Sequence, residues 1–203
     1  MCCAGELEAG IADVISNPSV DNPPRSSAYL LETRRDVSVS MVPVASVLFE
    51  LLGRRPVLDF YRSPAFLSSL AAGAAFFGVL PLLMAVQPLP WQRMLSVAFL
   101  LAVVWQPIVE ELLFRGCLQG VLTRRVWARR TVMGISAANL MTSMLFSSAH
   151  ILTHPFLWAL LMLFPSLLFG VLRDRSGSVV PPIALHILYN TGYFLIAGGS
   201  AIV

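Results

Sequence analysis

Two adjacent carboxylates and an arginine interrupt an apolar stretch of this chain. Glu110, Glu111 and Arg115 lie within residues 94–122, which otherwise have the composition of a membrane helix. An ionisable group at the centre of such a helix costs about 2.5–3.5 kcal/mol on insertion scales, so it persists where it pairs with another group or takes part in function. This segment is therefore the first place to look for chemistry.

Helical spacing separates the two carboxylates. Residues i and i+4 share a helix face, and Glu111 and Arg115 stand in this relation with the acid on the N-terminal side, the better order for an ion pair. Glu110 has Phe114 at the same offset and no cation. We therefore expect Arg115 to neutralise Glu111 and leave Glu110 free as a general base. The structural alternative is an ion cluster that closes a helix bundle.

Three histidines follow in the second half of the chain. His150 lies one helical turn after Phe146, His186 lies one turn before Asn190, and His154 lies in a short turn that we expect at the membrane interface. A lone histidine on an apolar face is more often a packing residue than a catalytic one. Polar groups on three separate helices, however, should all face the bundle interior rather than lipid. We therefore expect them to share one pocket.

These side chains allow three interpretations of the site. Peptide hydrolysis needs a general base, a water molecule and donors directed at the developing oxyanion, and acid, imidazole and amide groups supply the base and the donors. Alternatively, Glu110, His150 and His186 would form the two-histidine, one-glutamate set of a zinc protease, although no His-Glu-x-x-His helix is present. In the third interpretation the chain is not an enzyme but a proton-relay transporter, or an immunity or scaffold protein.

The composition identifies the elements that must position these groups as membrane helices. The 203 residues are 57% hydrophobic and 12% charged, whereas a soluble domain carries about 25% charged residues. The mean hydropathy is +0.76. The net charge of +3 comes from arginines that flank apolar runs, which indicates membrane topology rather than nucleic-acid binding. The three cysteines make no disulfide framework, and no cleavable signal peptide is evident.

The chain divides into a polar tail, a connecting segment and a membrane core. We expect residues 1–40 to form a loosely ordered tail, and residues 41–62 to form an interfacial helix or short span with a basic linker. Residues 63–203 should form an all-α polytopic bundle of five to six transmembrane helices around an interior polar cavity. The expected spans are Pro64–Val86, Met94–Leu122, Val132–Leu152, Phe156–Leu172 and Val179 to the C-terminus, with Arg173–Gly177 as a basic turn.

Arginines set the expected orientation of the bundle. The loops before the first span, after the second and after the fourth carry three, four and two arginines, whereas the opposite loops carry Arg93 alone, so the richer loops should be cytoplasmic. In straight, full-length helices His150 would lie near the outer face and His186 near the inner one. Some helix must therefore be displaced, broken or tilted, and the prolines offer places for this.

The three motifs, in this order and inside apolar helices, resemble those of the CPBP family, the group of CAAX prenyl protease type II and bacteriocin-processing (Abi) intramembrane proteases. The resemblance covers roughly residues 95–195. The motifs are Glu110-Glu111-x-x-x-Arg115, Phe146-x-x-x-His150 and His186-x-x-x-Asn190.

The resemblance implies a glutamic-type intramembrane endopeptidase that uses no cofactor and no metal. Glu110 would activate the attacking water with help from His150, and His186 and Asn190 would stabilise the oxyanion. The remaining motif residues would support these four: Glu111, Arg115 and Phe146.

The resemblance also implies a substrate class and a location. The partners would be the lipid bilayer and a membrane-anchored or lipid-modified protein or peptide, without nucleic acid. The location would be the cell membrane, as a multi-pass protein, and the composition suggests a prokaryote. Prenylated C-termini, leader peptides and C-terminal sorting signals (the substrates of a CTERM-processing member) all remain open, and sorting signals are our working expectation.

Overall fold

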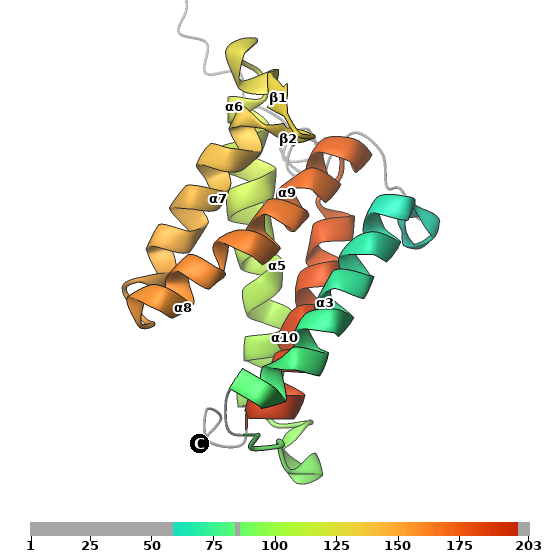
Figure 1. Ribbon diagram of the computed structural model, residues 1–203, viewed down its shortest axis with the longest axis vertical. Helices are drawn as coiled ribbons and strands as arrows, with labels where there is room; N and C mark the ends of the chain where they lie inside the picture. Colours follow the sequence, from blue (N-terminus) through green and yellow to red (C-terminus); the bar gives the residue numbers. More distant parts are fainter. Residues whose placement is uncertain (1–58, 84–85, 199–203) are drawn as a thin grey trace, which may run out of the picture. The chain divides into compact units, whose positions relative to one another are not determined.

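The computed structural model describes residues 59–83 and 86–198. They form a bundle of helices joined by short turns and one β-hairpin (Figure 1). The expected tail over residues 1–40 and most of the 41–62 segment lie outside the described residues. In chain order the elements are η1 (Phe60–Arg62), α3 (Pro64–Leu83), η2 (Trp91–Arg93), α4 (Val97–Leu100), η3 (Leu101–Trp105), α5 (Gln106–Glu111), η4 (Leu112–Gln119), α6 (Gly120–Leu122), η5 (Trp127–Arg129), β1 (Thr131–Val132), β2 (Ile135–Ser136), α7 (Ala137–His150), α8 (Phe156–Leu161), α9 (Leu163–Ser176) and α10 (Val180–Ala197).

Four helices among the described residues are long and apolar enough to cross a membrane, judged by length and composition. They are α3, the continuous helix from α4 to α6, the α8–α9 pair and α10. The predicted all-α membrane bundle is thereby confirmed. The predicted third span, Val132–Leu152, is wrong in length: α7 has 14 residues and extends about 21 Å at 1.5 Å per residue, less than the roughly 30 Å hydrocarbon core of a bilayer.

A β-hairpin replaces the expected start of this third span. Val132 pairs with Ile135 across a turn formed by Met133 and Gly134, whose φ angles are 51° and 81°. A two-residue turn with positive φ at both positions suits a hairpin, and glycine adopts it without strain. Ser136 is the N-cap of α7, and its Oγ accepts a hydrogen bond from the backbone N–H of Asn139 in the first turn. The apolar residues of the hairpin extend the hydrophobic pattern of α7, which is why the sequence predicts a helix that begins at Val132.

The short α7 resolves the mismatch in depth that straight helices would give. In Figure 1 the helices alternate in direction, and α7 together with α8 ends above the lower ends of α3 and α10. His150, the last residue of α7, therefore lies within the depth of the bundle rather than at its far face. The early end of α7 thus accounts for the placement of this histidine on the same cavity as Glu110.

The expected basic turn at Arg173–Gly177 is also wrong. α9 continues to Ser176 and ends where Gly177 adopts a left-handed conformation with φ 68°, a common helix terminator. The charges in the last turn had suggested a loop, but they belong to the helix. Pro165 does interrupt its helix, because α8 gives way to α9 at Met162, one turn before this proline, and proline cannot donate to the preceding turn.

The helix that carries the acidic motif widens on both sides of Glu110 and Glu111. Its π-helical segments η3 and η4 flank α5. Pro107 follows η3 and has no N–H to donate to the preceding turn. In η4 the side chain of Arg173 donates from Nε to the carbonyl of Arg115 at 3.2 Å. Side chains that enter the backbone ladder disturb helical geometry, and π segments are frequent at functional sites.

Candidate active site

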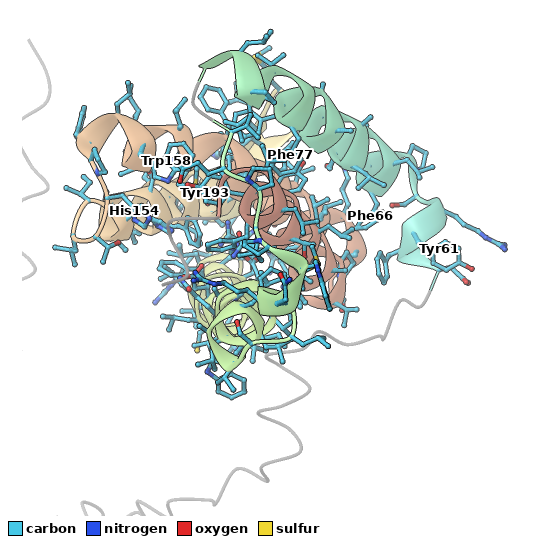
Figure 2. The ribbon with its side chains drawn as sticks, turned by 90° about the horizontal axis from the view of Figure 1, so that it is seen from below. Tyr61, Phe66, Phe77, His154, Trp158 and Tyr193 are labelled. Atoms are coloured by element: carbon cyan, nitrogen blue, oxygen red, sulfur yellow. The ribbon has the colours of Figure 1, made fainter. Side chains whose placement is uncertain are left out.

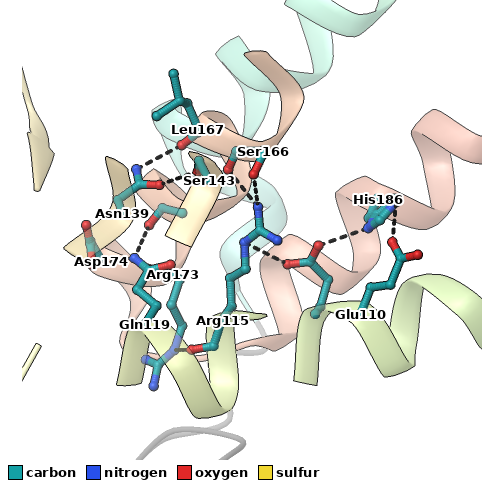
Figure 3. Close-up of polar contacts among 12 residues, drawn as sticks. Glu110, Arg115, Gln119, Asn139, Ser143, Ser166, Leu167, Arg173, Asp174 and His186 are labelled. Carbon is teal, nitrogen blue, oxygen red and sulfur yellow. Dashed lines mark hydrogen bonds and ion pairs between the residues drawn. The ribbon is translucent and has the colours of Figure 1, made fainter. Parts of the chain in front are cut away.

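The acidic pair divides as the helical spacing predicts, but both acids have further partners. Glu111 and Arg115 are fully buried, and Arg115 Nε lies 3.3 Å from Glu111 Oε2 (Figure 3). Glu110 points elsewhere and its side chain is 20% exposed. The expectation that Glu110 stands free is wrong, because Gln106 Nε2 donates to its Oε1 at 2.8 Å. Gln106 lies one helical turn before Glu110, so the spacing contained this signal.

His186 bridges the two carboxylates. Its Nδ1 lies 2.9 Å from Glu111 Oε1, and its Nε2 lies 3.8 Å from Glu110 Oε2. A carboxylate only accepts hydrogen bonds, so in the neutral ring the proton belongs on Nδ1 and the free lone pair on Nε2. His186 therefore presents Nε2 to the side of the site where Glu110 is exposed.

Aromatic rings hold the imidazoles in place. Phe169 stacks on His186 with ring centroids 4.7 Å apart, and Phe146 meets the same ring edge-on at 6.0 Å. Phe146 also lies 4.6 Å from the ring of His150 and 4.8 Å below the guanidinium of Arg115. This buried phenylalanine thus contacts groups from all three motifs.

His150 and Asn190 each use one polar atom to fix their orientation. Nδ1 of His150 lies 2.9 Å from the carbonyl oxygen of Phe146, which can only accept, so Nδ1 carries the proton and Nε2 can bind one. Nδ2 of Asn190 donates to the carbonyl oxygen of Ala102 at 3.0 Å. A side-chain amide has two N–H groups, so one remains for a ligand.

The polar groups meet at one interior cavity of about 350 Å³. Glu110, His150, His186 and Asn190 all line it, whereas Glu111 and Arg115 lie behind its wall. His154, expected at the interface, is exposed and also lines the cavity. The rest of the lining is mainly apolar, and Phe77, Trp158 and Tyr193 bring aromatic rings to it from α3, α8 and α10 (Figure 2).

A second polar network, which the sequence motifs did not reveal, extends from the site toward the hairpin (Figure 3). Gln119 Nε2 donates to Asp174 Oδ1 at 2.8 Å and to the Gly170 carbonyl at 3.1 Å, and Ser136 Oγ donates to Asp174 Oδ2 at 2.7 Å. Asn139 donates to the Leu167 carbonyl at 3.0 Å. Polar residues inside apolar helices were the available signal, since such groups need partners away from lipid.

The zinc interpretation lacks geometric support. A zinc site of two histidines and a glutamate needs three ligand atoms about 2 Å from one ion. Within residues 59–83 and 86–198, no group of three or more histidine, cysteine, aspartate or glutamate side chains is arranged to hold a metal ion.

The fold and the site define a polytopic membrane protein with acid, imidazole and amide groups on a cavity inside its helix bundle, an arrangement suited to hydrolysis within the membrane. A family model, type II CAAX prenyl endopeptidase Rce1-like, matches residues 90–192, just over half of the chain and all three motifs. The chain belongs to this family, whose members are membrane endopeptidases. No curated protein and no solved structure matches this chain.

Proposed function

We propose that this chain is a glutamic-type intramembrane endopeptidase that cleaves a peptide bond near the membrane-associated end of its substrate. The observation that carries the proposal is the shared cavity of Glu110, His150, His186 and Asn190. Four polar groups from three helices line it within an otherwise apolar bundle. A purely structural ion cluster would need the buried Glu111–Arg115 pair but no hollow beside it.

The geometry suggests how the four groups divide the reaction. Glu110, held by Gln106, takes a proton from a water molecule, and the unprotonated Nε2 of His150 helps to orient that water. The water oxygen bonds to the substrate carbonyl carbon, and the second N–H of Asn190 stabilises the resulting oxyanion. His186 donates to the same oxygen from Nε2 when both of its ring nitrogens carry protons, because Nδ1 already faces Glu111. Collapse of the intermediate breaks the C–N bond, and the proton on Glu110 passes to the amine.

The substrate we propose is a membrane-anchored protein with an apolar segment near the scissile bond. Members of the family act on prenylated or membrane-associated proteins. The aromatic lining of the cavity accommodates an apolar chain, and C-terminal sorting signals in a prokaryotic cell membrane remain our working choice. Cleavage assays in liposomes with matched prenylated, leader-type and sorting-signal peptides would decide among these substrates. Equal cleavage of all three peptides would argue against a dedicated sorting-signal protease.

The central experiment replaces the proposed base. Glu110→Gln should abolish cleavage while the protein stays folded, because the amide keeps the side-chain shape but cannot take a proton. Asp59→Asn, a matched change at an exposed carboxylate in front of η1, should leave cleavage unchanged. Unchanged cleavage by Glu110→Gln would remove the base assignment. Zinc in stoichiometric amount, with activity lost on chelation, would instead favour a metalloprotease, and proton flux without any cleavage would favour a transporter.

A further inference from the structure

A chain of buried contacts leads from the cavity to Ser166, a residue of α9 that belongs to none of the three motifs. Nη2 of Arg115 donates to Ser166 Oγ at 2.6 Å and to the Ser166 carbonyl oxygen at 2.8 Å (Figure 3). Arg115 then meets Glu111, and Glu111 meets the ring of His186. Ser166, Arg115 and Glu111 are each fully buried.

We infer that Ser166 is a positioning residue, which holds Arg115 and thereby fixes Glu111 and the imidazole of His186. The inference rests on the proposed function for its effect on catalysis, but its structural part concerns the ring of His186 alone. Ser166 does not line the cavity, so it acts through its neighbours rather than by touching a substrate.

The geometry of the Arg115–Glu111 pair is what makes Ser166 necessary. The pair is 3.3 Å apart, but neither Arg115 Nε nor Glu111 Oε2 makes a hydrogen bond among the described residues. The attraction keeps the Glu111 carboxylate beside the guanidinium, but without hydrogen-bond geometry it does not fix the orientation of the guanidinium itself. The two short bonds to Ser166 are charge-assisted and directional, so they set the position of the guanidinium.

The aromatic packing transmits any shift of this guanidinium to the histidine. The Arg115 guanidinium lies over Phe146 at 4.8 Å and over Phe169 at 5.4 Å. These two rings also contact His186, at 6.0 and 4.7 Å between centroids. Displacing Arg115 would therefore disturb His186 twice, through the carboxylate of Glu111 and through the rings.

The structural part can be tested without any substrate. The chain has three histidines, so ¹⁵N-histidine labelling gives a simple NMR spectrum of the detergent-solubilised protein, and His186→Gln assigns the ring signals of His186. Ser166→Ala should shift these signals. Ser143→Ala is the matched control, since Ser143 is equally buried and its Oγ donates to Asn139 Oδ1 at 3.0 Å, outside the Arg115 chain. The control should leave the signals in place.

The catalytic part is measured as a split between kcat and KM. Loss of one hydrogen bond to a charged group should lower the kcat of Ser166→Ala about tenfold, with KM unchanged because the cavity wall is unchanged. Unmoved His186 signals in Ser166→Ala, or a raised KM with unchanged kcat, would overturn the inference. If the alanine variant does not fold, Ser166→Cys fills nearly the same space with weaker hydrogen bonds and takes its place in both measurements. If neither the unaltered protein nor any variant cleaves any substrate, the proposed function is wrong. The NMR result would still test whether Ser166 positions the ring of His186.

Discussion

At the scale of single residues, two neighbouring glutamates differ in what they meet. Glu111 is fully buried, with Arg115 and His186 as partners, whereas Glu110 is partly exposed on the cavity. Two side chains of the same type, one position apart, therefore have different surroundings, and we expect Glu111 to stabilise the fold and Glu110 to serve catalysis. Substitutions that keep the shape and remove the charge should separate stability from activity.

Glu111→Gln should destabilise the protein, whereas Glu110→Gln should not. Removing one partner of a buried ion pair leaves the other charge uncompensated and costs about 3–5 kcal/mol, and in this chain the stranded charge would be Arg115. Glu110 has no arginine within ion-pair distance among the described residues, so we expect its variant to stay within about 1 kcal/mol of the parent. Thermal unfolding in detergent would measure both. Equal stability of the two variants would contradict the division.

Gln106→Ala should slow catalysis without changing the fold. The bond from Gln106 Nε2 to Glu110 fixes the rotamer of the proposed base, and its loss is worth about 1 kcal/mol, or about fivefold in kcat. Initial rates with a peptide substrate would measure this. Gln92→Ala removes an exposed glutamine of η2 and serves as the control. Equal rates for both variants would show that Glu110 is positioned by other contacts.

Spacing along one helix revealed some of these contacts and could not reveal others. Glu111 and Arg115 are four positions apart, so the pair was predictable. Glu111 and His186 are 75 positions apart, and Arg115 and Ser166 are 51 apart. Contacts of this kind depend on how the helices pack, and a serine in an apolar helix carries no signal of which partner it will meet.

At the scale of elements, α3 and α10 pack through small residues that admit large ones. A Cβ atom at Gly73 would lie 2.3 Å from Cε1 of Tyr189, and one at Gly192 would lie 2.6 Å from Cε2 of Phe77. Each helix thus receives an aromatic ring from the other at a glycine. Close approach at small residues is a principal source of helix association in membranes.

Gly73→Ala should loosen this contact and Gly78→Ala should not. The first change drives a methyl group into the ring of Tyr189, and overpacking of this kind costs about 1–3 kcal/mol. The second lies in the same helix, and no atom of the other described residues comes within 4 Å of the added Cβ, so alanine should be neutral or stabilising by up to about 1 kcal/mol through helix propensity. Thermal unfolding would compare the two. A loss of stability in both would mean that α3 resists alanine for reasons other than Tyr189.

Element boundaries were predictable where prolines stand at the start of an apolar run. The first span begins at Pro64 as expected, and the last begins within one residue of the expected Val179. The start of α7 was missed, because Val132 and Ile135 extend the apolar pattern while Met133 and Gly134 between them form the turn. Hydrophobicity alone does not separate a two-residue strand from the first turn of a helix.

At the scale of the whole chain, the family match and the cavity do not coincide. The matched residues begin at position 90, yet α3 contributes Ala72, Gly73, Phe76 and Phe77 to the cavity wall. The motifs therefore account for the polar side of the site, whereas part of its apolar side comes from a helix outside the match. The connection after α6 and the last turn of α9 both carry arginines and lie toward the top of Figure 1, so we expect this end of the bundle to face the cytoplasm.

Cysteine labelling in intact cells would test that direction. Val126 and Trp91 are 82% and 74% exposed and lie in the connections after α6 and before α4, at opposite ends of the bundle (Figure 1). Because arginine-rich loops stay in the cytoplasm, a membrane-impermeant maleimide should label Trp91→Cys and spare Val126→Cys, in a background where Cys2, Cys3 and Cys117 are serine. Permeabilised cells should show labelling of both variants. Labelling of Val126→Cys alone in intact cells would show that the orientation is the reverse of the predicted one. Labelling of both variants would mean that the two positions do not lie on opposite sides of the membrane.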